Sequence, residues 1–378
     1  MYCSSYVTGR GRLATTPNDP ESLSIQPVGL DGTFTKYSAL TRVRQEALYA
    51  KRFLRVVASF EPDLVIESND PLLAKWRVAR GLDQARIPWI FWLQDLYSVA
   101  IAGELRRRLG ASGSVLGRLP LAAEAALLRR AAAVVSITPD YDAQLDRWNV
   151  SASRRRVIPN WAPVEEITLR PKSRAWPEAH GVHSDHVVLY AGTLGLKHDP
   201  ALLLRLAEEL ADRRAAVVVV SEGAGADWLL EHGAQQANLV VLPFQPYDEL
   251  PEMLASADVL LTILNGSAGV FSVPSKLLTY LCAGRAVVAA VPAVNLAARV
   301  LGESGGGVVV EPDCCGQLVA AVRDLLADDD RRLGMGQRAR AFAEANFDVR
   351  AVAEQFLDLI NQSRSSRTPM RTSYTSPS

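Results

Sequence analysis

Apolar residues occur along this chain in short, β-branched runs, and the stretches between the runs show the spacing of amphipathic helices. The runs predicted as strands are 63–67, 89–93, 133–138, 156–158, 186–195, 215–220, 239–244, 258–264 and 306–310. The stretches predicted as helices are 38–59, 116–132, 200–212, 250–255, 316–327, 330–346 and 349–360. Strands that alternate with helices form parallel sheets, so the pattern predicts an α/β fold of two Rossmann-like, doubly wound domains.

A turn-rich segment at 160–177 separates the two halves of this pattern. The domains predicted from it are 1–162 and 163–346, followed by a crossing helix at 347–361 that returns to the first domain and a disordered, Ser/Thr/Arg-rich tail at 362–378. Doubly wound sheets bind ligands beyond the carboxyl ends of their strands. The chemistry is therefore expected in strand-end loops that face a cleft between the domains.

Composition narrows the possible partners. The chain has 41 Lys and Arg residues against 41 Asp and Glu residues, a balance that gives no reason to expect a nucleic acid. The four cysteines show neither a disulfide framework nor zinc-finger spacing, so a cytoplasmic location is expected. We find no secretory signal and no apolar run long enough to span a bilayer. The Arg-rich segment 104–135 fits either contact with the inner face of the plasma membrane or a solvated helix face.

Two glycine-containing turns follow strands in the second half. In the first, AGTLGLKHDP at 191–200, Gly192 permits close approach of a ligand and Lys197 can reach a phosphate. The second turn contains Gly223 and Gly225. The alternative is a pair of ordinary turns with a surface lysine. Neither turn is a G-x-G-x-x-G fingerprint and no G-x-x-x-x-G-K-[ST] motif occurs, which argues against a dinucleotide dehydrogenase and a P-loop NTPase.

The stretch FSVPSKLLTYLCAGRAVVAA, 271–290, predicts a loop, a short helix and a buried strand. Pro274 suits a first helical turn, and Gly284 suits a helix end. The first-turn amides of such a helix have no intrahelical partner. Because Lys276 lies beside them, and lysine is rare in this Arg-rich chain, the helix start is a candidate anion site.

Other polar residues leave alternatives open. His180, His183 and His186 are spaced by threes, which is compatible with metal ligands but is more typical of structural or solvent-facing histidines. Gln94 and Asp95 end a buried strand in the first half, which contains no histidine. Asp95 is either a catalytic group or the cap of the helix that follows.

Taken together, these motifs resemble those of the GT-B glycosyltransferases of family four, and within them the bacterial colanic-acid and O-antigen biosynthesis type. The matching stretches are 92–98, 157–165, 187–204, 221–230, 273–290, 311–329 and 346–360. Each motif alone is degenerate, whereas their order and spacing together are specific. The resemblance covers nearly the whole chain except the tail.

The resemblance implies a hexosyltransferase-type enzyme of cell-surface polysaccharide biosynthesis. Its second domain would bind a nucleotide-sugar donor, expected to be UDP-linked, and its first domain a lipid-linked or glycan acceptor. Transfer would proceed with retention, without a bound metal and without a cofactor, because the nucleotide sugar is a co-substrate. A different function, that of a degenerate GT-B nucleotide-binding partner protein without transferase activity, is the alternative.

The resemblance also assigns residues. Asp95 and Lys197 would be catalytic, Lys197 by holding the donor diphosphate. The residues implied in substrate binding are Gln94, Gly192, Thr193, Lys197, Gly223, Gly225, Gln245, Pro246, Phe271, Ser275, Lys276 and Thr279. Gln245 and Pro246 match the loop that covers the base.

The chain departs from the family pattern at several of these positions. Phe271 and Thr279 stand where many members carry two glutamates, the second of which contacts the ribose. Thr193 and Gln94 replace a frequent arginine and a frequent histidine. The family's first strand-loop-helix unit has no counterpart before 1–13, so we expect Met1 to be internal to the natural reading frame.

Overall fold

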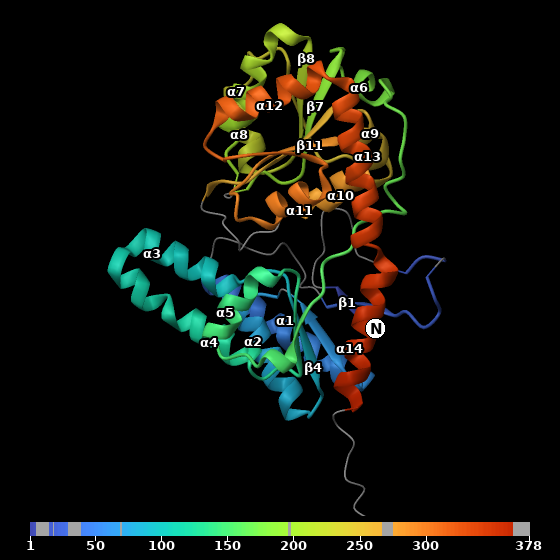
Figure 1. The fold of residues 1–378 in the computed structure, drawn as a ribbon. Coiled ribbons are helices and arrows are strands. Elements are labelled where there is room, and N and C mark those ends of the chain that lie inside the picture. Colours follow the sequence, from blue (N-terminus) through green and yellow to red (C-terminus); the bar gives the residue numbers. More distant parts are fainter. Residues whose placement is uncertain are drawn as a thin grey trace, which may run out of the picture. The chain divides into compact units, whose positions relative to one another are not determined.

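The computed structural model describes residues 1–4, 15–17, 19–28, 39–68, 70–195, 198–266 and 275–365. Its contacts divide the chain into two compact units, which are described separately: unit 1 is 1–158 with 355–378, and unit 2 is 159–354. The sequence placed the first boundary at 162/163, a few residues later. Both units are parallel α/β structures, as predicted (Figure 1).

Unit 1 contains a four-stranded parallel sheet in the order β3-β4-β5-β6. The strands are β3 (Val65–Ser68), β4 (Trp89–Leu93), β5 (Ala133–Ser136) and β6 (Arg155–Val157). The helices are α1 (Ala39–Phe60), α2 (Leu72–Gln84), α3 (Tyr97–Leu116), α4 (Arg118–Leu128) and α5 (Asp142–Arg147). A separate parallel pair joins β1 (Tyr2–Ser4) to β2 (Ile25–Pro27). All four strands predicted for 63–158 are confirmed, with β3 at one edge of the sheet.

The last helix, α14 (Val349–Ser365), belongs partly to unit 1. Phe356 packs edge-on against Trp92 of β4 with 5.2 Å between ring centroids, and Arg156 donates a hydrogen bond to Gln362. The predicted return of the C-terminal helix to the first domain is therefore confirmed. The helix extends to Ser365, so the first residues of the predicted tail are helical, and 366–378 lie outside the described residues.

Unit 2 contains a six-stranded parallel sheet in the order β12-β11-β10-β7-β8-β9. The strands are β7 (His186–Ala191), β8 (Ala215–Val220), β9 (Leu239–Leu242), β10 (Val259–Ile263), β11 (Ala286–Ala290) and β12 (Gly307–Val310). The chain builds outward from β7 through β8 to β9, then continues on the other side of β7 with β10, β11 and β12. The strand order therefore reverses between β7 and β10, which makes this pair the topological switch point of the sheet.

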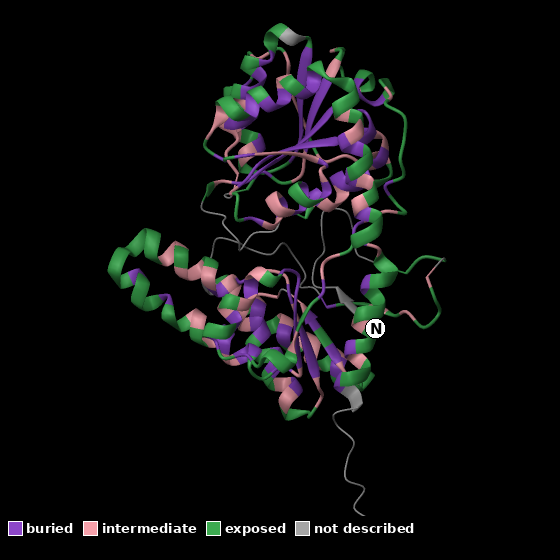
Figure 2. Ribbon diagram, in the orientation of Figure 1, coloured by how far each residue is buried: buried purple, intermediate pink, exposed green. Residues whose placement is uncertain are grey.

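Helices cover both faces of the unit 2 sheet, and the strands between them are mostly buried (Figure 2). One face carries α7 (Ala201–Glu209), α8 (Ala224–His232) and α12 (Cys315–Ala327); the other carries α9 (Leu250–Ala255), α10 (Lys276–Cys282), α11 (Leu296–Ser304) and α13 (Asp329–Asn346). Burial on both sides explains why β8 reads as the continuous apolar run AAVVVV rather than as an alternating pattern.

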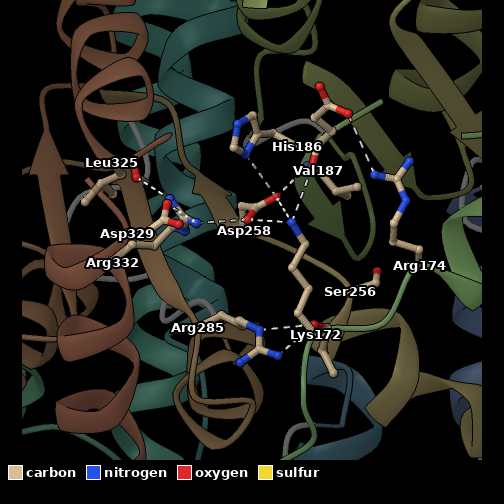
Figure 3. Close-up of polar contacts among 12 residues, drawn as sticks. Lys172, Arg174, His186, Val187, Ser256, Asp258, Arg285, Leu325, Asp329 and Arg332 are labelled. Atoms are coloured by element: carbon tan, nitrogen blue, oxygen red, sulfur yellow. Dashed lines mark hydrogen bonds and ion pairs between the residues drawn. The ribbon is translucent and has the colours of Figure 1, made fainter. Parts of the chain in front are cut away.

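An ion-pair cluster lies at the amino-terminal edge of this sheet, directly before β10 (Figure 3). The buried carboxylate of Asp258 accepts hydrogen bonds from Lys172 Nζ at 2.7 Å and from the backbone N–H of Val187 at 2.9 Å. Arg332 Nη2 of α13 lies 3.3 Å from Asp258 Oδ1, and His186 Nδ1 lies 3.6 Å from Asp258 Oδ2. Asp258 thus connects the segment before β7, the start of β7 and α13. His186 lies beside this structural ion-pair cluster.

Candidate functional site

The carboxyl-terminal edge of the unit 2 sheet carries most of the predicted site. The pairing of β10 with β7, Val259 with Val188 and Leu260 with Leu189, sets the two strands side by side. Gly192 directly follows β7, and α10 follows β10 along the chain. The first residue of α10, Lys276, thereby reaches the edge where β7 ends.

Lys276 is the most unusual charged group on this edge. Its Nζ lies 3.7 Å from the centroid of the Tyr190 ring, a cation–π contact. The Nζ atom is buried and has no hydrogen-bond partner among the residues that the structure describes. Burial lowers the pKa of Lys276 from its ordinary value of 10.5 to about 7. Among the described residues, the charged form of Lys276 therefore has no hydrogen-bonding counterpart.

Gly192 provides the space that the lysine occupies. A Cβ atom at this position would lie 2.9 Å from Cε and 3.0 Å from Nζ of Lys276. Its φ of +137° is also a conformation that favours glycine. The hydroxyl of Tyr280 bonds to both backbone groups of Ala191, accepting from N–H at 2.8 Å and donating to the carbonyl at 3.0 Å. The strand end is therefore fixed beside the ammonium.

The loops after β7 and β8 are joined to each other. The N–H of Leu194 donates to Ser221 Oγ at 3.1 Å, and the N–H of Gly225 donates to the Leu194 carbonyl at 3.2 Å. A Cβ at Gly225 would lie 2.6 Å from Cβ of Leu194, so the close approach requires glycine. Gly223, directly before α8, has a φ of +98°. The two predicted glycine turns are thus hydrogen-bonded to each other at the same edge of the sheet.

Thr193 and α10 supply further predicted residues. Thr193 is exposed, and its carbonyl accepts a hydrogen bond from the Tyr190 hydroxyl at 3.0 Å. Ser275 occupies the N-cap of α10, is exposed and does not cap the helix with its side chain. Thr279 is half-buried one turn further along.

Two predicted residues, Lys197 and Phe271, lie outside the described residues. Their assignments, the diphosphate contact of Lys197 included, stay predictions.

Gln245 and Pro246 lie in the loop after β9, the edge strand of the sheet. Gln245 donates to the Pro243 carbonyl at 2.8 Å, and its Oε1 lies 3.1 Å from Nε2 of His180. The His180 ring stacks on Trp176 with 4.3 Å between centroids. These contacts hold Gln245 in place and give His180 a structural role. Among the described residues, no group of three His, Cys, Asp or Glu side chains is placed to hold a metal ion.

In unit 1, Gln94 and Asp95 directly follow β4 at its carboxyl end. The Tyr141 hydroxyl donates to the Gln94 carbonyl at 2.9 Å. Burial raises the pKa of Tyr141, and the nearby charge of Asp95 raises it further. Leu96 occupies the N-cap of α3, so the alternative that Asp95 is the cap residue of this helix is wrong.

A set of buried charges in unit 1 was not singled out from the sequence. Lys75 Nζ lies 3.5 Å from the Glu124 carboxylate, which also accepts from the N–H of Ser98 at 3.0 Å. Glu67, at the carboxyl end of β3, has no hydrogen-bond partner among the described residues, and burial raises its pKa well above the ordinary value. Burial also raises the pKa of Asp70 to about 6. The available sequence signal was Glu67, a carboxylate at the end of the apolar strand predicted for 63–67.

Tyr190 and Tyr280 were also missed. Both lie in stretches predicted as strand and helix, where a tyrosine is compatible with an ordinary core residue. Only the pairing of β7 with β10 shows that Tyr190 lies against Lys276 and that Tyr280 bonds to the backbone of Ala191.

Each half of the chain matches a known protein family. Residues 10–161 match the family described as glycosyl transferase 4-like domain, and 185–328 match glycosyl transferases group 1. A protein of Escherichia coli (strain K12), named as a colanic acid biosynthesis glycosyl transferase, WcaI, is 26% identical over 334 residues, covering 86% of this chain and 78% of its own.

Solved structures show the same fold. The Anabaena protein Alr3699/HepE, in complex with UDP and glucose, superposes with a TM-score of 0.67 at 16% identity, over 89% of this chain and 86% of that one. Sucrose-phosphate synthase from Thermosynechococcus elongatus superposes with a TM-score of 0.70 at 18% identity, over 93% and 87%.

Proposed function

Because the chain belongs to the GT-B glycosyltransferases of family four, we propose that it transfers a sugar from a nucleoside diphosphate to a lipid-linked or glycan acceptor. The names of similar proteins support a role in the biosynthesis of polysaccharide or lipopolysaccharide. A UDP-linked donor is favoured by the Anabaena structures, which hold UDP or UDP-glucose in the same fold.

The observation that carries this proposal is the unpartnered ammonium of Lys276 at the switch point of unit 2. A diphosphate placed there gives the lysine charge-assisted hydrogen bonds that the described protein atoms do not provide. As the sugar departs, negative charge grows on the leaving diphosphate. A fixed, desolvated cation stabilises this charge more than a solvated one does.

Acceptor binding is assigned by this proposal to unit 1, through Gln94 and Asp95 at the end of β4. Transfer with retention and without a metal, and a diphosphate contact of Lys197, follow from the family pattern and complete the proposal. Within the described residues no helix is both long and apolar enough to cross a membrane. Contact with the membrane through 104–135 stays a prediction.

A nucleotide screen tests the donor assignment. We expect UDP to raise the melting temperature of the chain more than ADP, GDP or inorganic phosphate, because a bound ligand stabilises the native state by mass action. Release of UDP from UDP-sugars in the presence of crude lipid acceptor then tests transfer. Stabilisation by UDP without sugar transfer would support the nucleotide-binding partner instead of the enzyme.

Gly192→Ala is expected to weaken both folding and UDP binding. The methyl group would displace the Lys276 ammonium, and the left-handed backbone would be strained at a cost of about 1–3 kcal/mol. The matched control is Gly302→Ala in α11, where a Cβ meets no atom within 4 Å and helix propensity favours alanine. Equal UDP affinity and equal melting temperatures of the two variants would contradict the role given to Gly192.

A further inference from the structure

The segment 94–96 joins β4 to α3 and contains Gln94 and Asp95, which the proposed function assigns to the sugar acceptor. At its start, the Tyr141 hydroxyl donates to the Gln94 carbonyl at 2.9 Å. At its end, the N-cap residue Leu96 makes no side-chain hydrogen bond to the first turn of α3. The N–H groups of a first helical turn have no partner within the helix, so another element has to supply the oxygen that fixes this end.

That oxygen belongs to Glu124 of α4. Its Oε2 accepts from the N–H of Ser98 in the first turn of α3 at 3.0 Å, and its Oε1 lies 3.5 Å from Lys75 Nζ. The ammonium of Lys75 in turn lies 4.9 Å from the ring centroid of Tyr97, the first residue of α3. The Lys75 and Glu124 side chains are 0% and 1% exposed. One buried ion pair therefore contacts both residues that begin α3.

Stability alone does not explain a buried ion pair at this place. Two charges lose their hydration when they are buried, and apolar side chains of similar volume often stabilise a core equally well or better. An apolar side chain, however, has no oxygen to aim at one particular N–H, and a buried N–H without a partner is destabilising. What Glu124 supplies is therefore the position of the α3 start.

We propose that Glu124 is a positioning residue of the sugar-acceptor site, which fixes the first turn of α3 through the Ser98 N–H and thereby orients Asp95. Lys75 orients the Glu124 carboxylate through its other oxygen. Because Asp95 directly precedes the N-cap residue of α3, a shift of the first turn moves its carboxylate. This role rests on the proposed function, since only that proposal assigns Asp95 to the sugar acceptor.

Two double variants of the full chain separate the hydrogen bond from the charges. Lys75→Met with Glu124→Gln and Lys75→Met with Glu124→Leu both remove the ion pair and keep side chains of similar size, but only the first keeps an oxygen for the Ser98 N–H. In the leucine variant, amide hydrogen exchange over 94–100 should be about tenfold faster. The amount of crude lipid acceptor that gives half-maximal UDP release from UDP-sugars should also rise about tenfold. The glutamine variant should match the wild type in both measurements.

Calorimetry with UDP provides the control, because the residues assigned to the donor belong to unit 2 and both double variants should bind UDP as the wild type does. If the leucine variant does not fold, Glu124→Asp replaces it: the charge stays, but the shorter side chain no longer reaches the Ser98 N–H, and the same rise in half-maximal lipid acceptor is expected.

Equal dependence on the lipid acceptor in the two double variants would overturn the proposal, even if their amide exchange differed, because Glu124 would then stabilise α3 without serving the acceptor site. An equal loss in both variants would assign the effect to the charges and would contradict it as well. A wild type that binds UDP but releases none from any UDP-sugar would instead contradict the proposed function, and the acceptor role of Glu124 would fall with it.

Discussion

Lys276→Met is expected to weaken UDP binding by about 10- to 150-fold, because a hydrogen bond to a charged group contributes roughly 1.5–3 kcal/mol. Methionine keeps most of the length of the side chain and its contact with the Tyr190 ring. The substitution therefore removes the ammonium and little else. Titration calorimetry with UDP measures the effect directly.

The same substitution should stabilise the native state, although it weakens UDP binding. In the native protein the pKa of Lys276 is lowered to about 7, whereas the unfolded chain has the ordinary value of 10.5. Between these values the unfolded state binds more protons, so the free energy of unfolding of the wild type rises with pH through this window. Below pH 7 the buried charge destabilises the fold fully. Lys276→Met should abolish this slope and raise stability near pH 6 to 7.

Arg331→Met is the matched control, because Arg331 is an exposed cation of unit 2 whose side chain forms no hydrogen bond or ion pair within the described ranges. It should bind UDP as the wild type does. If Lys276→Met lost UDP binding together with stability, the loss would reflect misfolding, and the assignment of Lys276 to the diphosphate would lack support. Unchanged binding in Lys276→Met would contradict the assignment outright.

Asp258→Ala should destabilise unit 2 by about 3–5 kcal/mol, the usual consequence of removing one partner from a buried ion pair. The change leaves Lys172 and Arg332 without their shared carboxylate, and it leaves the N–H of Val187 without an acceptor (Figure 3). The loss is large compared with the 5–15 kcal/mol that typically separates native from unfolded domains. Urea unfolding, followed by the fluorescence of the tryptophans of unit 2, measures it.

Lys172→Ala provides the comparison for this prediction. The Lys172 side chain is 37% exposed, and without it Asp258 keeps Arg332 and the Val187 amide. The loss should therefore be closer to 1 kcal/mol, as is usual for a partly exposed pair. Equal losses in Asp258→Ala and Lys172→Ala would show that the cluster does not join β7, β10 and α13.

Much of the fold could be predicted because parallel strands covered on both faces appear as unbroken apolar runs. β8, β10 and β11 are of this kind, and each was visible in the sequence. The order of the strands was not visible, because apolar runs carry no information about their neighbours. The switch point between β7 and β10, and with it the contact of Lys276 with Tyr190 and Gly192, appears only in three dimensions.

The charged residues of unit 1 show the same limit of sequence reasoning. Lys75 and Glu124 are distant in sequence and look like ordinary helix-surface residues, yet the fold buries both and pairs them. The motif around Ser275 and Lys276 was recognisable because local sequence alone places a cation at a helix start.

Proton uptake on UDP binding tests the central claim most directly. At about pH 8.5 UDP is fully ionised and most Lys276 side chains of the free protein are neutral, so a bound diphosphate should draw close to one proton onto the lysine. Calorimetry in two buffers of different ionisation enthalpy measures this number. We predict uptake of about one proton by the wild type and none by Lys276→Met. UDP binding without proton uptake, at the same affinity in both proteins, would contradict the claim that Lys276 holds the diphosphate.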